Sequence, residues 1–142
     1  MKIKNCSLED IKILAEMNKC LIEDEKSTNS MDINQLTNRM AGFLKNGYNA
    51  YFFIINDKII GYALCDMTKE PIYLRQFFIK KEERRKHYGK NAFKKLLEKI
   101  NTNEIEIEVL HKNEVGFKFW QNIGFIEQWT RMRFEKMNPK DY

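Results

Sequence analysis

Apolar side chains recur at intervals of three and four positions along the first third of the chain, the spacing of a helix that buries one face. This spacing predicts a first helix from about Ser7 to about Glu23, with Ser7 at the start of a capping box. The same spacing predicts a second helix that begins at Asp32 and stops at Asn46-Gly47. The polar segment DEKSTNS joins them. We therefore expect a pair of helices with a mobile link.

A different pattern follows, in which β-branched and aromatic residues form three segments, AYFFIIN, IIGYALCDM and IYLRQFFI. Short turns separate these segments, so they are predicted to form an antiparallel meander. Residues 2–6 have the composition of a further short strand at the start of the chain.

Helical spacing returns from Gly89 to Asn101. Isoleucine and valine then alternate with glutamate over residues 104–109, which predicts a strand with one apolar and one acidic face. A short helix ended by Gly124 and a closing strand from Phe125 to Phe134 complete the pattern. The predicted order is βααβββαβαβ, an α/β sandwich around a mixed sheet.

Length and composition restrict the class of protein. A chain of 142 residues is expected to form one domain, residues 1–142. It has no run of about 18 apolar residues and no apolar stretch of signal-peptide length, so we expect a cytoplasmic protein that does not enter a membrane. The three cysteines, Cys6, Cys20 and Cys65, lack CxxC spacing and have no histidine nearby, which predicts reduced core or near-core residues and no metal site.

The net charge of +5 is concentrated in one segment, residues 80–95. Such a basic segment suits a polyanion, and it equally suits a solvated helix face. A nucleic-acid partner is disfavoured, because the basic residues gather at a helix amino terminus and no aromatic stacking platform is interleaved with them.

The stretch RRKHYGKNAF, residues 84–93, lies between the predicted strand that ends at Ile79 and the helix that opens at Gly89. A helix amino terminus has unpaired N–H groups and the positive end of the helix dipole, so a phosphate placed there satisfies both. Glycine lets the backbone approach the phosphate oxygens closely. Taken alone, the pattern fits a phosphate-binding loop or an ordinary strand-to-helix turn.

Together with the order of elements, this loop resembles that of the GNAT superfamily of acyl-CoA-dependent N-acyltransferases, over nearly the whole chain. In that family the loop reads Gln or Arg, two residues, Gly, one residue, then Gly or Ala. Here Arg84 opens the loop, His87 holds the first glycine position and Gly89 holds the second. A second family pattern, Asn-x-x-Ala-x-x-Phe-Tyr-x-x-x-Gly-Phe, is matched in part by Asn113, Gly116, Phe119, Trp120, Gly124 and Phe125.

The resemblance implies a GNAT-type fold, with a mixed, mostly antiparallel central sheet flanked by helices, and acetyl-CoA as co-substrate. It implies that backbone N–H groups from Arg85 to Gly89 wrap the pyrophosphate, and that Phe77 to Ile79 pair with the pantetheine amides. Nearby lysines and arginines suit the remaining phosphate. The residues expected to bind the cofactor are Phe77, Phe78, Ile79, Arg84, Arg85, Lys86, His87, Tyr88, Gly89, Lys90, Asn113 and Phe119.

His87 is the main departure in the loop. A histidine still carries a backbone donor, so we expect phosphate binding to survive without the first glycine. If position 87 requires a positive φ, histidine adopts it with less strain than a β-branched residue, at a cost of about 1 kcal/mol or somewhat more.

Three residues are candidates for the chemistry. Trp120 stands where many family members have the tyrosine that protonates the leaving thiolate, but an indole N–H does not titrate, so Trp120 is either a wall beside the CoA sulfur or a core aromatic. Tyr73, on the strand before the loop, could relay a proton or simply pack across the sheet. Glu108 could accept the amine proton through water or simply lie on the polar face of its strand.

The acceptor is indicated by charges of both signs. Arg75 occupies a usual general-base position, but a guanidinium does not deprotonate near neutral pH, so we expect it to grip a carboxylate or phosphate of the substrate. Glu23, Asp24 and Glu25, at the end of the first helix, would attract a cationic amine, and a solvated helix terminus has the same composition. We therefore expect a zwitterionic or phosphorylated primary amine rather than a polyamine.

The function implied is that of an N-acetyltransferase, which transfers an acetyl group from acetyl-CoA to a primary amine, expected to be that of a small molecule. The alternative is a CoA-binding regulatory or sensor module with little or no turnover, because Trp120 and Arg75 depart from the family pattern. Acetyl-CoA and the amine are the expected partners. No metal, nucleic acid or membrane is expected, and the chain is expected to be a monomer or homodimer.

Overall fold

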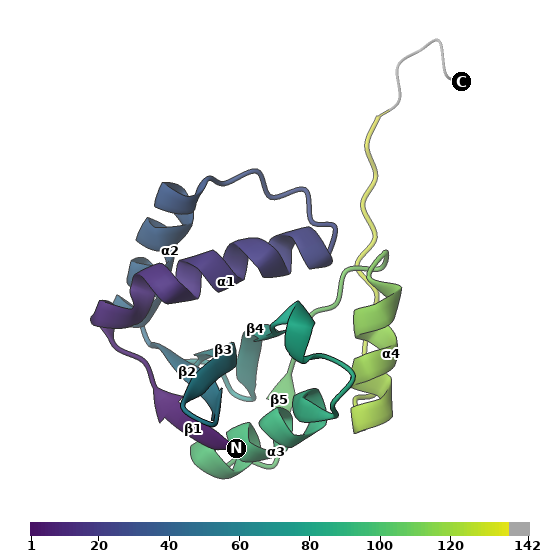
Figure 1. Cartoon of the computed structure of the whole chain (residues 1–142). Helices are drawn as coiled ribbons and strands as arrows, with labels where there is room; N and C mark the ends of the chain where they lie inside the picture. Colours follow the sequence, from purple (N-terminus) through teal and green to yellow (C-terminus); the bar gives the residue numbers. More distant parts are fainter. Residues whose placement is uncertain (137–142) are drawn as a thin grey trace.

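One five-stranded sheet forms the centre of the computed structural model, which describes residues 1–136 (Figure 1). The strands lie in sequence order, and each pairs with the next antiparallel except the last, which is parallel to its neighbour. The strands are β1 (Lys2–Asn5), β2 (Tyr48–Ile55), β3 (Lys58–Asp66), β4 (Ile72–Ile79) and β5 (Ile105–Glu106).

Helices cover both faces of this sheet. In Figure 1, α1 and α2 lie together over one face, α3 lies against the other, and α4 stands beside the β5 edge. Two short 3₁₀ turns, Leu8–Asp10 and Lys81–Glu83, precede α1 and α3. The helices are α1 (Ile11–Asp24), α2 (Ile33–Lys45), α3 (Tyr88–Ile100) and α4 (Glu114–Ile123).

The helix starts follow from the caps in the sequence. At α2 the Gln35 N–H donates to the Asp32 carboxylate at 2.8 Å and the Asp32 N–H donates to the Gln35 side chain at 2.9 Å. Ser7 and Asp10 form the equivalent box before α1. Each box satisfies two N–H groups that a helix start leaves unpaired. The predicted start of α2 is confirmed, whereas the Ser7 box caps the 3₁₀ turn Leu8–Asp10 and α1 begins after it, at Ile11.

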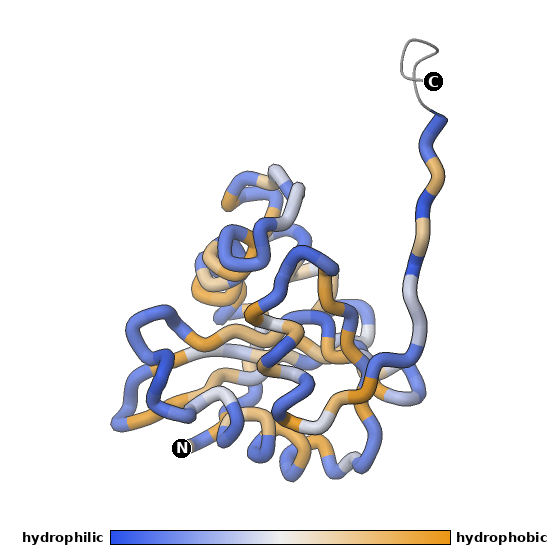
Figure 2. The backbone as a smooth tube through the Cα atoms, turned by 90° about the vertical axis from the view of Figure 1, so that its right-hand side faces the viewer, coloured by the Kyte–Doolittle hydropathy of each residue, from blue (hydrophilic) through white to orange (hydrophobic). Residues whose placement is uncertain are grey.

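The apolar residues form a core layer on each face of the sheet. The layer under α1 and α2 includes Phe52 and Tyr62, and the layer over α3 includes Phe53 and Leu96; all four are at most 1% exposed. Figure 2 shows these hydrophobic segments inside, with hydrophilic turns at the rim. Adjacent residues of one strand enter opposite layers because side chains alternate across a sheet.

A bulge interrupts the pairing of β3 with β4. Leu64 pairs with Gln76 and Cys65 pairs with Leu74, so Arg75 is the extra residue on β4. A bulge bends its strand and redirects side chains. It places Arg75 on the α2 side of the sheet, where its guanidinium lies 4.8 Å from the centre of the Phe43 ring.

The predicted mixed, mostly antiparallel sheet flanked by helices is confirmed, but the last strand of the predicted order is wrong. Residues 125–136, here called the C-terminal arm, contain no strand, because a strand needs a partner and the arm has none within the described chain. The acidic strand is also shorter than predicted, with ladder pairing only at Ile105 and Glu106.

Cys20 is exposed, against the prediction of a core or near-core position. Over residues 1–136, no helix has the length and apolarity that crossing a bilayer requires.

Candidate functional site

The free edge of β4 leads directly to the loop before α3. On its β5 side, β4 pairs only at Ile72 and Tyr73, and the rest of the strand, through Ile79, has no strand partner there in the described part of the chain. Strand edges without a partner expose N–H and C=O groups that an extended ligand can bond. The predicted pantetheine-pairing segment, Phe77 to Ile79, lies on this open edge.

The loop itself has the backbone geometry of an anion nest. Arg85 and His87 have φ values of +65° and +62°, with Lys86 at negative φ between them. Backbones that alternate in this way turn successive N–H groups toward one point and bind anions. Within residues 1–136 no backbone carbonyl accepts from the N–H groups of these three residues. The loop therefore presents free donors at the amino terminus of α3.

The sequence did not determine whether residue 87 adopts a positive φ, and in the structure it does. Histidine holds the left-handed conformation at a cost of about 1–3 kcal/mol, which glycine would avoid. Gly89 does not have positive φ; its need for a small residue comes from packing, because a Cβ there would lie 2.9 Å from the Phe119 ring. The glycine pattern of the loop thus has two separate causes.

We predict opposite effects for two substitutions at position 87. His87→Gly should leave the free energy of unfolding within about 0.5 kcal/mol, because relief of strain offsets the larger unfolded-state entropy of glycine. His87→Val should lower it by about 1–3 kcal/mol, because a β-branched residue is least tolerant of this φ. Urea unfolding of the two variants checks this. Equal stability of the valine variant and the wild type would contradict the strained geometry.

A buried carboxylate anchors the loop to the sheet. Glu83 is 9% exposed and pairs with Lys58 at 3.0 Å and Lys86 at 3.1 Å. Its hydrogen bonds to Lys58 and then Lys86 hold the pKa of Glu83 below its usual value. A lowered pKa in the folded state stabilises the fold above the unfolded-state pKa, and this contribution is lost as pH falls through the folded-state value.

We therefore expect loop anchoring to weaken in acid. The difference in thermal stability between wild type and Glu83→Gln should be largest near neutral pH and shrink below about pH 4.5, where Glu83 takes up its proton. Differential scanning calorimetry of both proteins over this range measures it, and other carboxyl groups cancel in the difference. A difference that stays constant down to pH 3 would show that the ionised pair does not stabilise the loop.

The side chain of Arg84 is directed back toward the protein. Its Nε donates to the Ile79 carbonyl at 2.9 Å, and its guanidinium pairs with Asp24 at the end of α1. It also lies 5.5 Å from the centre of the Phe78 ring. Arg84 therefore links the loop to α1, and its guanidinium is engaged by these contacts within the protein. It also divides the predicted acidic group, because Asp24 is paired with Arg84 while Glu23 is exposed.

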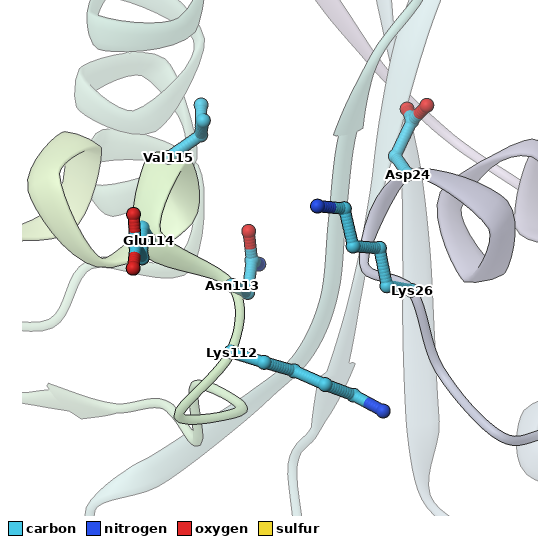
Figure 3. A pocket seen from close by; sticks show the side chains of 6 residues that line it. All are labelled: Asp24, Lys26, Lys112, Asn113, Glu114 and Val115. Atoms are coloured by element: carbon cyan, nitrogen blue, oxygen red, sulfur yellow. The ribbon is translucent and has the colours of Figure 1, made fainter.

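A cavity of about 240 Å³ lies between the end of α1 and the start of α4 (Figure 3). In Figure 3, the lysine side chains from the two sides reach into the gap in front of the sheet. Asn113 caps α4 by accepting from the Gly116 N–H at 3.1 Å. The cavity is lined by cationic, acidic, polar and apolar side chains: Asp24, Lys26, Lys112, Asn113, Glu114 and Val115.

Two of the three predicted catalytic residues lie close together. Burial, and then the nearby Glu108 carboxylate, raise the pKa of Tyr73 to about 12. Tyr73 is therefore protonated at neutral pH and is a hydrogen-bond donor rather than a base. The carboxylate of Glu108 is exposed, beyond the end of β5. The pair offers a proton acceptor and a hydroxyl relay at the side of the sheet where β4 and β5 diverge.

Trp120 is surrounded by aromatic rings. Its ring lies edge-on to Phe77 at 5.1 Å, Phe119 at 4.8 Å, Phe93 at 5.7 Å and Phe125 at 5.1 Å between centroids. Edge-to-face contacts of this kind stabilise packing. The surroundings favour a packing role, in which Trp120 supports Phe77 on β4 and Phe119 beside Gly89.

Charged groups of both signs lie on the α1–α2 side of the sheet. The Arg75 guanidinium donates to the Tyr48 hydroxyl at 3.3 Å. Burial, and then the positive charge of Arg75, lower the pKa of Arg39, whose Nε is buried without a partner in the described chain. Burial, and then the charge of Asp24, raise the pKa of Glu25. Arg39 also donates to the Asn18 side chain at 3.1 Å, and within residues 1–136 neither Arg39 nor Arg75 forms an ion pair with a carboxylate. Guanidinium groups without an ion-pair partner favour an anion between α2 and β4.

Sequence reasoning missed four residues of this region: Tyr48, Lys58, Glu83 and Arg39. Lys58 and Glu83 are far apart in sequence, and no short motif joins them. Arg39 lies on a helix face whose sequence pattern is typical of a solvated face.

The predicted cofactor residues are divided between α3 and the two faces of β4. Tyr88 and Lys90 lie in the first turn of α3. Phe78 is buried on the α1 face of the sheet, while Phe77 faces α3. In residues 1–136, no three His, Cys, Asp or Glu side chains are grouped to hold a metal ion.

Solved structures share this architecture. A possible acetyltransferase from Clostridium difficile is 15% identical, with a TM-score of 0.75, over 96% of this chain and 98% of that chain. An aminoglycoside antibiotic 6'-N-acetyltransferase from Acinetobacter haemolyticus is 14% identical, with a TM-score of 0.73, over 97% and 99%. A predicted acetyltransferase from Clostridium acetobutylicum, solved with acetyl-CoA, is 16% identical, with a TM-score of 0.70, over 99% and 97%.

Sequence comparison assigns the family. No curated protein matches the chain significantly. A family model described as an acetyltransferase (GNAT) domain matches residues 8–138, which is most of the chain. The chain therefore belongs to the GNAT acetyltransferase family.

Proposed function

We propose that this protein is an N-acetyltransferase that uses acetyl-CoA to acetylate a primary amine of a small molecule. We propose further that residues 1–142 form a single N-acyltransferase domain that acts in the cytoplasm. The observation that carries the proposal is the open edge of β4, which continues into the nest of free N–H groups at the start of α3. An extended pantetheine chain fits the strand edge, and a pyrophosphate fits the nest.

Residues of this chain would perform the remaining steps. The Glu108 carboxylate, with Tyr73 beside it, would accept the proton that the amine loses as it attacks the thioester. Trp120 has no titratable proton for the leaving thiolate. A thiol with a pKa near 8.5 leaves without a dedicated acid, so we expect transfer to be slower than with an acid and still measurable.

The acceptor is proposed to carry an anionic group as well as an amine. Arg75 and Arg39 supply positive charge beside α2, while Glu25 supplies a carboxylate at the end of α1. A zwitterion or a phosphorylated primary amine satisfies both signs. The likeness to an aminoglycoside acetyltransferase supports a small-molecule amine, whereas an aminoglycoside, which is polycationic, would leave the arginines facing like charge.

A two-step experiment tests the proposal. Isothermal titration of the full chain with CoA comes first, and a Kd weaker than about 1 mM would refute the cofactor site. A screen of primary amines for CoA release from acetyl-CoA follows, with paired amines that differ by one carboxylate or phosphate. Turnover with any amine supports the enzyme. Tight CoA binding with no turnover across the screen would instead support the sensor alternative.

A further inference from the structure

The loop before α3 holds two left-handed residues without glycine at either position. Arg85 and His87 have φ values of +65° and +62°, a region that residues with a Cβ rarely adopt. Such a conformation persists only where the surrounding structure fixes it. If either residue relaxed to negative φ, the alternation that turns the N–H groups toward one point would be lost. Contacts from outside these two residues must therefore hold the nest in shape.

Glu83 joins this loop to the hairpin of β2 and β3. Its two carboxylate oxygens accept separate hydrogen bonds, Oε1 from the Lys58 ammonium at 3.0 Å and Oε2 from the Lys86 ammonium at 3.1 Å. The Glu83 side chain is buried, whereas the two lysine side chains are 59% and 52% exposed. Glu83 is thus the buried centre of the group, and its removal has a larger effect than loss of an exposed ion pair.

Lys86 lies between the two left-handed residues and connects them to Glu83. Besides its bond to Glu83, its ammonium lies 5.9 Å from the centre of the Tyr88 ring. These contacts fix the side chain at both ends of the nest and restrict the backbone of residue 86. In the described chain the Lys86 N–H donates to no backbone carbonyl. The side chain is therefore engaged by the protein, while the backbone donor is left for a ligand.

Lys58 gives this group a fixed point. It is the first residue of β3, directly after the two-residue turn Asn56-Asp57, and it pairs with Ile55. Both turn residues have positive φ, +50° and +62°, the geometry whose twist matches that of a hairpin. The Lys80 N–H also donates to the Ile60 carbonyl at 2.8 Å. The chain that enters the loop is therefore bonded to the same hairpin.

We propose that Glu83 is a positioning residue for the cofactor, which holds the nest in its binding conformation in place of the glycines that this loop lacks at positions 85 and 87. This inference rests on the proposed use of acetyl-CoA, because the nest is the part of the site assigned to the pyrophosphate. Charge alone gives the opposite expectation, since a carboxylate beside the loop repels a phosphate and its removal should tighten binding. The direction of the effect therefore separates the two roles.

Isothermal titration of the full chain with CoA measures that direction. Glu83→Gln should raise the Kd about 10-fold, as expected if the nest conformation falls to about a tenth of the population. Lys58→Met changes no residue of the loop and leaves the bond to Lys86, so it should raise the Kd less, by about threefold. Lys12→Met is the matched control, because it removes the same charge from an exposed position on α1, and it should bind CoA as the wild type does.

The outcomes of this titration are distinct. Equal or tighter binding by Glu83→Gln would overturn the positioning role and leave the proposed function standing. A Lys58→Met variant that matches the Lys12→Met control would also overturn it, because the hairpin would then not hold the nest. A wild type that binds no CoA would refute the proposed function and the positioning role together.

Glycine at the two left-handed positions supplies a second test. Arg85→Gly with His87→Gly lets the loop adopt positive φ without strain, so the nest no longer depends on Glu83 to the same extent. In this background Glu83→Gln should raise the Kd for CoA by about threefold or less, against about 10-fold in the wild-type background. Thermal unfolding checks that all variants are folded. An effect of Glu83→Gln that is equal in the two backgrounds would show that Glu83 does not act through the backbone of the nest, and would overturn the proposal.

Discussion

Replacing Gly89 with proline is expected to weaken CoA binding by about 10- to 150-fold. Gly89 lies in the first turn of α3, where its N–H is one of the donors with no partner inside the helix. Proline removes that donor and disfavours the helical conformation of the preceding Tyr88. A hydrogen bond to a charged group contributes about 1.5–3 kcal/mol, which corresponds to this range of Kd. Isothermal titration with CoA measures it.

Gly89→Ala is the matched control for this substitution. It introduces the same Cβ, which would lie 2.9 Å from the Phe119 ring, and it keeps the N–H donor. The ratio of the two Kd values therefore isolates the donor and the backbone of Tyr88 from the steric contact. Proline is tolerated in the first turn of a helix, so both variants should fold, and thermal unfolding checks that they do. Equal Kd values for the two variants would remove the backbone donor from the binding site.

The parts of the fold that the sequence predicted correctly are those with a local cause. The cap at Asp32 places the start of α2, the cap at Ser7 starts the 3₁₀ turn that leads into α1, and Gly124 ends α4. Alternating and helical periodicities identify the other elements because burial of one face imposes them. The loop before α3 was located by residue types around Gly89, which lie next to one another in the sequence.

Features with a non-local cause were not predicted. The bulge at Arg75 depends on how β4 pairs with β3, and the anchoring of Glu83 depends on Lys58 in a distant hairpin. The sequence pattern of the arm is that of a strand, and this pattern does not identify its partner. The closing strand was therefore wrong as an element of this fold, because no strand pairs with residues 125–134 in the described chain.

The positions of the predicted catalytic residues have different consequences for mechanism. Tyr73 lies on β4 and Glu108 lies just after β5, and the two approach each other where β4 and β5 diverge, which is where the thioester would lie if pantetheine follows β4. Trp120 instead lies among four aromatic rings. We therefore expect proton removal from the amine to be assisted and protonation of the thiolate to depend on solvent.

Arg75→Ala is expected to lower kcat/KM by about 10- to 150-fold for acceptors with an anionic group, and to leave matched acceptors without that group unchanged. The guanidinium is held by the Tyr48 hydroxyl and the Phe43 ring, and its positive charge adds to burial, the larger cause, in lowering the pKa of Arg39. An acceptor anion would relieve this repulsion and gain a charge-assisted contact of about 1.5–3 kcal/mol.

Two further variants separate charge from geometry. Arg75→Lys keeps the charge and loses the planar pair of donors, so it should recover part of the activity toward anionic acceptors. Tyr48→Phe keeps Arg75 and removes the hydroxyl that positions it, so its loss should be smaller and confined to the same acceptors. Specificity constants for paired amines, measured with all three variants and the wild type, show whether Arg75 binds the anionic group of the acceptor. An equal loss for anionic and uncharged members of each pair would make Arg75 a residue that supports the bulge of β4, and the acceptor would then have no reason to carry an anionic group.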